Sequence, residues 1–308
     1  MNATLHISLA PIAYYWSREA TLQFYADAMQ WPIDTLYLGE VVCSRRHQLR
    51  LADWISLAKE CRQAGKDVVL STLTLIDSET DRRQMRKCVD AAYTEGFLVE
   101  ANDFSAVRAI HALGEKFIAG PHLNVYHEGT LTWLQSLGAL RFIPPVELCR
   151  DDLQALQTRR PQAMQTEIQV WGRMALAYSS RCFTARRHHL RKDSCEFSCE
   201  HYPDGLALAT REHNDFLTIN GIQTQSANCL DLGPQIPSLI KMGVEYIRLQ
   251  PQSAHMEHIV HAFDLARKQH QASTVDRAFL PPHAEASNGY WLGKAGMRWE
   301  TIPIHHVS

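Results

Sequence analysis

The sequence lacks the features that would place it in several simple classes. No run of about 18 uncharged apolar residues occurs, so nothing predicts a transmembrane helix. The opening residues M-N-A-T-L-H-I-S-L-A-P have neither the basic region nor the long apolar region of an export signal, and we therefore expect a cytoplasmic protein. The formal net charge of -2 gives no general attraction to nucleic acid or anionic membranes.

Cysteine is also scarce. Eight cysteines in 308 residues are far below the density of a disulfide scaffold. In a reducing compartment, cysteines that cluster indicate metal ligation or catalysis rather than bridges. Neither H-E-x-x-H nor G-x-S-x-G occurs, so the residues themselves give no support for a peptidase. With 45% hydrophobic and 21% charged residues, the chain can nevertheless bury a large core.

Short β-rich runs alternate with amphipathic stretches along most of the chain, at a spacing of about 25 to 30 residues. This order predicts a β/α barrel-like fold of eight parallel strands. An open sheet is the second choice, because no G-x-G-x-x-G follows the first strand. The expected strands are Leu5–Leu9, Thr35–Leu38, Val68–Leu73, Phe97–Val99, Phe117–Ala119, Leu140–Ile143, Glu167–Val170 and Val244–Leu249.

One helix has a well-defined pattern. Phe104, Val107, Ile110 and Leu113 recur at three-residue spacing, with Asp103 placed to cap the start. Gly114 can end the helix in a left-handed turn. Ser78 and Asp81 form a similar capping pair for the preceding helix.

The alternation of strands and helices is interrupted in the second half of the chain. We expect one domain over 1–308 that includes a cysteine-bearing loop at 179–203, a β-hairpin insertion at 204–226 and a C-terminal arm at 272–308. After the hairpin, C-L-D-L at 229–232 resumes the barrel. The arm holds aromatic and apolar residues that favour burial: Tyr290, Trp291, Met297 and Trp299.

Three candidate metal-binding cysteines lie in the cysteine-bearing loop. Cys195 and Cys199 lie four residues apart, and Cys182 precedes them by a twelve-residue excursion. Cys43 follows the second strand and Cys182 the seventh, and a barrel brings the carboxyl ends of its strands to one mouth. Four thiolates could hold structural zinc or an iron–sulfur cluster. A single close C-x3-C pair, in a loop with more basic than acidic residues, favours the cluster.

Other interpretations of the cysteines stay open. The three loop cysteines could be incidental members of a solvated basic loop. Cys61, Cys88, Cys149 and Cys229 are better explained by packing, and Cys229 is the substitute if Cys43 is not a ligand. His188 and His189 suit the loop surface or a hydrogen bond to a ligand, since four cysteines already complete a cubane.

Four motifs together resemble the UbiU/UbiV group of the collagenase-like peptidase family: G-E-V-V-C-S-R-R at 39–46, C-x12-C-x3-C at 182–199, C-L-D-L at 229 and N-G-Y-W at 288. The resemblance covers nearly the whole chain. It implies a 4Fe-4S cluster on Cys43, Cys182, Cys195 and Cys199. It also implies a heterodimer with UbiU, cooperation with the lipid-binding UbiT, and hydroxylation of a ubiquinone precursor ring without oxygen. Relatives that hydroxylate RNA draw their oxygen from prephenate, which suggests the same donor here.

Polar residues near predicted strand ends are candidates for a substrate cavity at the same mouth. Glu100, Asn102 and Asn124 are the candidate catalytic residues, because their strands are short and their loops begin at once. Loop capping or solvation is the alternative for each. The remaining members of the set are Glu40, His122, Glu167 and Arg173.

Three functions compete at this point. The chain could be the iron–sulfur subunit of a hydroxylase, in which case it contributes to catalysis. It could instead carry a cluster that relays electrons or is structural, with catalysis in UbiU. The third possibility is a zinc-bound protein that modifies RNA or cleaves peptides.

Overall fold

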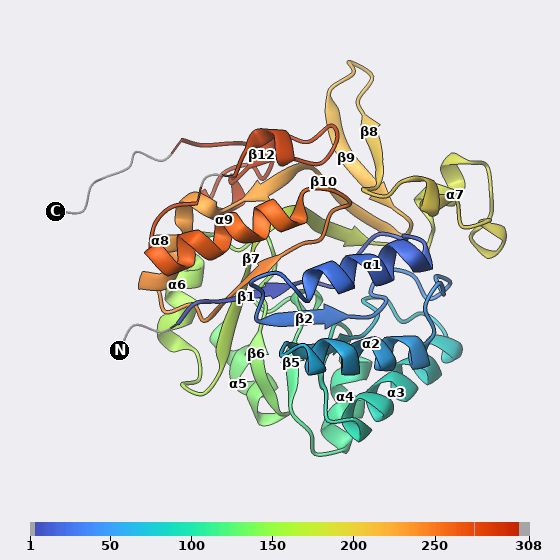
Figure 1. Cartoon of the computed structure of the whole chain (residues 1–308), viewed down its shortest axis with the longest axis horizontal. Helices are drawn as coiled ribbons and strands as arrows, with labels where there is room; N and C mark the ends of the chain where they lie inside the picture. Colours follow the sequence, from blue (N-terminus) through green and yellow to red (C-terminus); the bar gives the residue numbers. More distant parts are fainter. Residues whose placement is uncertain (1–3, 274, 302–308) are drawn as a thin grey trace.

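The computed structural model describes residues 4–273 and 275–301, and its centre is a closed barrel of eight parallel strands (Figure 1). Strand β11 pairs with both β1 and β7, which closes the ring and excludes the open sheet. The β/α barrel prediction is therefore confirmed. The strands of the ring are β1 (His6–Leu9), β2 (Thr35–Leu38), β3 (Asp67–Ser71), β4 (Leu98–Ala101), β5 (Phe117–Ala119), β6 (Ala139–Phe142), β7 (Gln165–Tyr178) and β11 (Tyr246–Leu249).

Helices connect the strands and surround the ring. Except for α7, which contacts β9 and η3, the α-helices bury apolar residues in the main core around the strands, as short parallel strands with covered outer faces require. The α-helices are α1 (Arg18–Ala28), α2 (Leu51–Gln63), α3 (Glu79–Thr94), α4 (Phe104–Ala112), α5 (Glu128–Ser136), α6 (Arg150–Arg159), α7 (Phe183–Arg187), α8 (Ile236–Lys241) and α9 (Met256–Gln269). The 3-10 helices are η1 (Pro121–Leu123), η2 (Lys192–Ser194), η3 (Ser198–His201), η4 (Gly233–Gln235), η5 (Arg277–Phe279) and η6 (Tyr290–Leu292).

The capping residues of α3 and α4 act as predicted, but the apolar face of α4 is narrower than expected. The Asp103 side chain accepts a hydrogen bond from the Ser105 backbone N–H at 2.7 Å, and Gly114 adopts a φ of 72°. Val107 and Ile110 are buried, whereas Phe104 and Leu113 are 48% and 49% exposed. A strict three-residue spacing drifts around a helix of 3.6 residues per turn, so the ends of the series leave the core face.

An antiparallel extension lies outside the ring. It consists of β8 (Leu206–Ala209), β9 (Asp215–Asn220) and β10 (Gln223–Asp231), and β10 pairs with the distal part of β7. The predicted hairpin is therefore present, and it projects from the barrel in Figure 1. The C-L-D-L segment was wrongly predicted to resume the barrel, because it forms the end of β10; β12 (Ala286–Ser287) pairs with it.

The barrel interior contains a network of buried charges. Arg248 contacts Glu167 at 3.0 Å and Glu100 at 2.9 Å, and Arg141 contacts the second Glu167 oxygen at 3.0 Å. The hydroxyl of Tyr37 donates to Glu167 at 2.6 Å. Burial alone would raise the pKa of Glu167, but the charges of Arg248 and Arg141 hold it below its usual value.

The C-terminal arm packs on the barrel only in part. Trp291 is buried, and its indole N–H donates to Gln235 at 3.1 Å. Tyr290 is half-buried, while Met297 is 60% exposed and Trp299 lies under the guanidinium of Arg277. The expectation that all four residues are buried is therefore wrong. Within the arm, residues 274 and 302–308 lie outside the described residues. No described helix has the length and apolar character needed to span a membrane.

Candidate functional site

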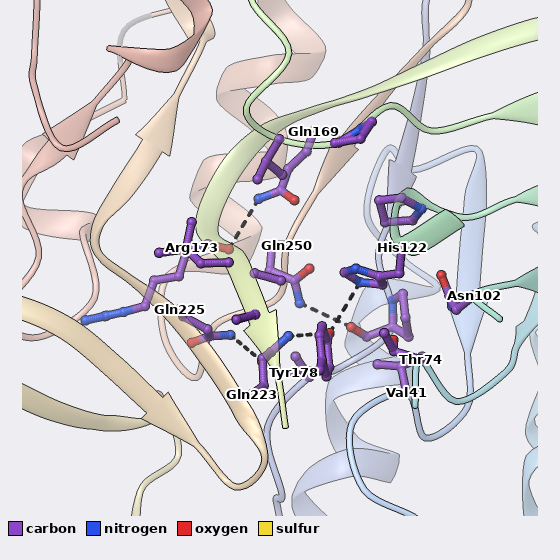
Figure 2. Close-up of a pocket in the computed structure, with 18 of the residues that line it drawn as sticks. Val41, Thr74, Asn102, His122, Gln169, Arg173, Tyr178, Gln223, Gln225 and Gln250 are labelled. Carbon is purple, nitrogen blue, oxygen red and sulfur yellow. Dashed lines mark hydrogen bonds between the residues drawn. The ribbon is translucent and has the colours of Figure 1, made fainter. Parts of the chain in front are cut away.

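A cavity of about 270 Å³ opens at the carboxyl ends of the barrel strands. This is the end of a β/α barrel at which chemistry takes place. Figure 2 shows its polar lining, which is dominated by neutral side chains from β7, β10 and the loops that follow the other strands. Its lining includes Val41, Thr74, Glu100, Asn102, His122, Asn124, Gln169, Arg173, Tyr178, Gln223, Gln225, Arg248 and Gln250.

Three polar atoms in this lining are buried without a hydrogen-bond partner among the described residues: Asn102 Oδ1, Thr74 Oγ1 and Arg173 Nε. Asn102 is 4% exposed, and its amide N–H₂ donates to the Thr72 carbonyl at 3.1 Å and to Glu100 at 3.3 Å. These contacts fix the amide orientation. A buried polar atom without a partner costs about 1–3 kcal/mol, so a ligand that supplies the partner is favoured.

Gly120 has no side chain, and the Asn102 side chain occupies the space that one would fill. A Cβ atom at position 120 would lie 2.0 Å from Asn102 Oδ1. The β5–α5 connection therefore needs a glycine to let this amide stand at the cavity wall.

Tyr178, Gln223 and His122 form a polar group in the same cavity, and Figure 2 shows their contacts. The Tyr178 hydroxyl accepts from Gln223 Nε2 at 2.6 Å and lies 3.3 Å from His122 Nε2. Burial, with a contribution from the nearby Arg248, lowers the pKa of His122 to about 3. Its imidazole is neutral near pH 7 and offers one donor and one acceptor.

Acidification should destabilise the fold through His122. Its folded-state pKa lies below the unfolded value of about 6.5, so between these values the unfolded chain binds a proton that the folded chain does not, and stability falls as pH falls. Because the ring is partly exposed, we expect a loss of about 1 kcal/mol between pH 7 and 5. Urea unfolding of the chain and of His122→Gln at both pH values measures it. An equal loss in both proteins would contradict the assignment.

The candidate residues predicted from the sequence occupy several different environments. Asn102 lies in the cavity wall, whereas Asn124 is exposed at the rim with a left-handed φ of 54°. Glu100 and Glu167 are held in the buried charge network rather than free for proton transfer. The guanidinium of Arg173 donates to Thr218 and to the Pro282 carbonyl. Loop capping is the role observed for Glu40, which accepts from the backbone N–H groups of Val42 and Cys43 at 2.8 and 3.1 Å.

Three of the four predicted cysteine ligands share one neighbourhood. Cys182 packs against the small apolar cluster that contains Cys43, and Cys199 lies within electrostatic range of Cys182. Burial raises the pKa of Cys43 to about 11 and also raises the pKa of Cys199. The positive charge of Arg46 opposes both shifts, so it favours thiolates at both positions.

The loop that carries Cys43 is attached to the cysteine-bearing loop by several side-chain contacts. Arg45 donates to the Asp193 carbonyl at 2.7 Å, and Gln48 donates to Glu200 at 3.1 Å. The rings of His47 and Phe197 meet edge to face with centroids 5.0 Å apart. Segments about 150 residues apart in sequence therefore lie side by side around the cysteines.

Arg46 was not singled out from the sequence, yet it anchors this region. It is buried, donates to the Ala13 carbonyl and to Asn220 at 2.6 Å each, and lies 3.7 Å from Glu40. Its Nε is buried without a partner among the described residues. The only sequence signal was its position in C-S-R-R, three residues after Cys43.

The donor chemistry suits an iron–sulfur cluster. All four cysteines are free, and Arg46 supplies positive charge next to a group that would be anionic. Glu196 and Phe197, between Cys195 and Cys199, have positive φ angles of 49° and 51°, a strained backbone that is often found at binding sites. In residues 4–273 and 275–301, no three His, Cys, Asp or Glu side chains are grouped closely enough to hold a metal ion. Binding would therefore draw the four thiols together.

The other cysteines have separate environments. Cys61 and Cys229 are fully buried in the main core, and Cys88 packs partly against it. Cys149 is not a core residue: it precedes α6, and its thiol donates to Asp152 at 3.1 Å, which corrects the packing expectation. His188 and His189 are exposed.

The cysteine neighbourhood borders the cavity. Val41 and Tyr178 line the cavity and also pack in the cluster that includes Cys43 and Cys182. No described cysteine lines the cavity itself. A ligand in the cavity and a group on the cysteines would therefore be separated by about one layer of side chains.

Comparisons with known proteins found several similar solved structures and one matching family model. A solved U32 peptidase structure is similar over 82% of this chain and 94% of its own, at 11% identity and a TM-score of 0.44. A tryptophan synthase complex from Pyrococcus furiosus is similar over 87% and 92%, at 12% identity and a TM-score of 0.43. A phospho-2-dehydro-3-deoxyheptonate aldolase from Thermotoga maritima is similar over 87% and 69%, at 11% identity and a TM-score of 0.48. The family model described as peptidase family U32 matches residues 20–292, and the chain belongs to that family.

Proposed function

We propose that the chain is the iron–sulfur subunit of an oxygen-independent hydroxylase that acts on the ring of a ubiquinone precursor, in a heterodimer with UbiU. The observation that carries the proposal is the approach of Cys43, Cys182 and Cys199 to one another beside the cavity at the barrel mouth. A 4Fe-4S cluster, when bound by these cysteines and Cys195, supplies one-electron redox chemistry. The lipid-binding UbiT and prephenate as oxygen donor belong to the same proposal and rest on the family resemblance.

The residues of the cavity bind and orient a small polar molecule. Asn102 Oδ1 accepts a hydrogen bond from the ligand, and Thr74 Oγ1 can donate or accept one. The neutral His122 and the Tyr178 hydroxyl offer further polar contacts without adding a charge. Such a wall suits hydroxyl, carbonyl and carboxylate oxygens around a ring.

A second candidate is an electron relay, with catalysis in UbiU. It is favoured by the absence of any described cysteine from the cavity lining, and by the 9% exposure of Cys43. In that case the cavity of this chain would not hold the ring or the oxygen donor during the reaction.

Asn102→Ala separates these candidates. If the cavity of this chain binds a reactant, loss of the amide should lower the rate of ring hydroxylation by the co-purified heterodimer about 10–100-fold, as for other lost buried hydrogen bonds. The measurement is the hydroxylated product formed under anaerobic conditions. Asn124→Ala is the matched control, because Asn124 is exposed at the rim of the same cavity.

Iron content must be measured in each variant, so that loss of the cluster is not mistaken for loss of binding. A rate within twofold of the unaltered protein for Asn102→Ala, with full iron content, would reject catalysis in this cavity and leave the relay. Equal losses in Asn102→Ala and Asn124→Ala would contradict a specific role for Asn102.

A further inference from the structure

A second cavity lies in the helix layer, outside the barrel. Its volume is about 320 Å³, and it is formed by α2, α3 and the segments that follow β2 and β3. It shares no lining residue with the cavity at the barrel mouth. The size is near the lower end of the range for small-molecule sites, about 300–1,000 Å³.

The walls of this cavity are apolar. They include Leu49, Leu51, Trp54, Leu70, Leu73 and Met85. Leu49, Leu70, Leu73 and Met85 are buried from bulk solvent, and Trp54 is half-buried. An apolar body placed between these side chains gains contacts that the unfilled space does not provide.

Three of the polar residues that line this cavity, Ser71, Thr72 and Glu40, already have hydrogen-bond partners. Ser71 Oγ donates to Glu100 at 2.6 Å, and Thr72 Oγ1 donates to the Glu100 carbonyl at 3.2 Å. Glu40 is engaged by the backbone N–H groups after β2 and by Arg46. A polar group placed against these three residues would lose its water without gaining a partner, so this part of the cavity selects an apolar group.

The rim carries positive charge. Arg50, the N-cap residue of α2, and Lys87, in α3, are exposed there. The exposed ring of His47 also lines the cavity. Neither Arg50 nor Lys87 forms an ion pair with another residue in the described part of the chain. The two cations are therefore free to meet an anionic group that stays at the entrance while an apolar body enters.

From these features we propose that the cavity between α2 and α3 binds a single-chain amphiphile with a carboxylate head group, a ligand of the fatty-acid class. The chain lies along Leu70, Leu73 and Met85, and the carboxylate lies between Arg50 and Lys87. Ser44 and Arg46 also line the cavity, so the bound ligand contacts the loop that carries Cys43. This site is independent of the proposed hydroxylase activity and needs no cluster to form.

Calorimetric titration of the full chain with decanoate tests the proposal. We expect saturable 1:1 binding that tightens about fourfold for each methylene group added between octanoate and decanoate. Decylamine, which has the same chain and the opposite charge, should bind at least about tenfold more weakly. Lys87→Glu should weaken decanoate binding about tenfold, whereas Arg86→Glu, on the same exposed turn but outside the cavity lining, should leave it unchanged.

Cysteine alkylation tests whether decanoate binds in this cavity. Cys88 lies in the cavity wall, and Cys149 is half-buried elsewhere. Bound decanoate should slow alkylation of Cys88 by N-ethylmaleimide, read by peptide mass spectrometry, and leave Cys149 unaffected. The proposal is overturned by an absence of saturable binding, by equal binding of decylamine, by equal effects of Lys87→Glu and Arg86→Glu, or by unchanged alkylation of Cys88.

Discussion

Replacing Arg248 with Met should lower the free energy of unfolding by about 3–5 kcal/mol, the usual cost of removing one partner from a buried ion pair. Arg248 is the only described cation that contacts both Glu100 and Glu167, at 2.9 and 3.0 Å. Both carboxylates are completely buried. Methionine fills much of the volume but leaves Glu100 without a cationic partner, so the loss is mainly electrostatic rather than a loss of packing.

Chemical denaturation measures this change, and two further variants make it interpretable. Arg150→Met removes a cation from an exposed pair with Asp151 and should have little effect. Glu100→Gln combined with Arg248→Met should recover part of the loss, since it removes the unpaired charge. An equal loss in Arg248→Met and Arg150→Met would show that the buried network does not stabilise the barrel.

The same network shows where interpretation of the sequence was limited. Glu100 and Glu167 were expected to line a substrate cavity because each lies at or near the end of a predicted strand. Their partners, Arg248 and Arg141, come from other strands, and only closure of the ring brings the four charges together. Sequence position correctly placed these residues in the barrel, but it could not show which charges were already paired.

The barrel strands were predictable because each is a short apolar run between amphipathic helices. β7 was the exception, since it continues to Tyr178, past its predicted end at Val170 and through Gly172. Gly172 has a φ of 108°, and a Cβ atom there would lie 2.3 Å from the Gln250 side chain. The glycine therefore lets the strand pass close to β11 and continue to pair with β10, where a strand ending was expected.

The cysteine ligand set, unlike the barrel, stays a prediction. Local spacing suggested Cys182, Cys195 and Cys199 as ligands, and the expected barrel geometry suggested Cys43. The contacts that attach the two loops, between Arg45 and Asp193 and between Gln48 and Glu200, involve exposed side chains with no periodic signal. Nothing in the sequence indicated these contacts, and the only signal for Arg46 was its position three residues after Cys43.

Replacing Cys43 with Ala should remove most of the iron and acid-labile sulfide from anaerobically purified protein, as much as Cys195→Ala does. Cys43 is 139 residues from Cys182 in sequence, yet the two side chains pack together at the barrel mouth. Alanine cannot ligate iron, so the cluster would be left with one iron open to water. Iron, sulfide and the visible absorption spectrum measure the loss, and a zinc assay tests the alternative metal.

The controls are the cysteines that lie apart from this site. Cys61→Ala and Cys88→Ala should keep full iron and sulfide, because Cys61 is enclosed in the core and Cys88 packs against it. Cys229 was the substitute ligand, but it is completely buried in the main core, so Cys229→Ala should also keep its iron. Full iron in Cys43→Ala together with loss in Cys229→Ala would move the fourth ligand to Cys229. Such a result would require β10 to leave its pairing with β7, since Cys229 lies opposite Arg173 in that ladder.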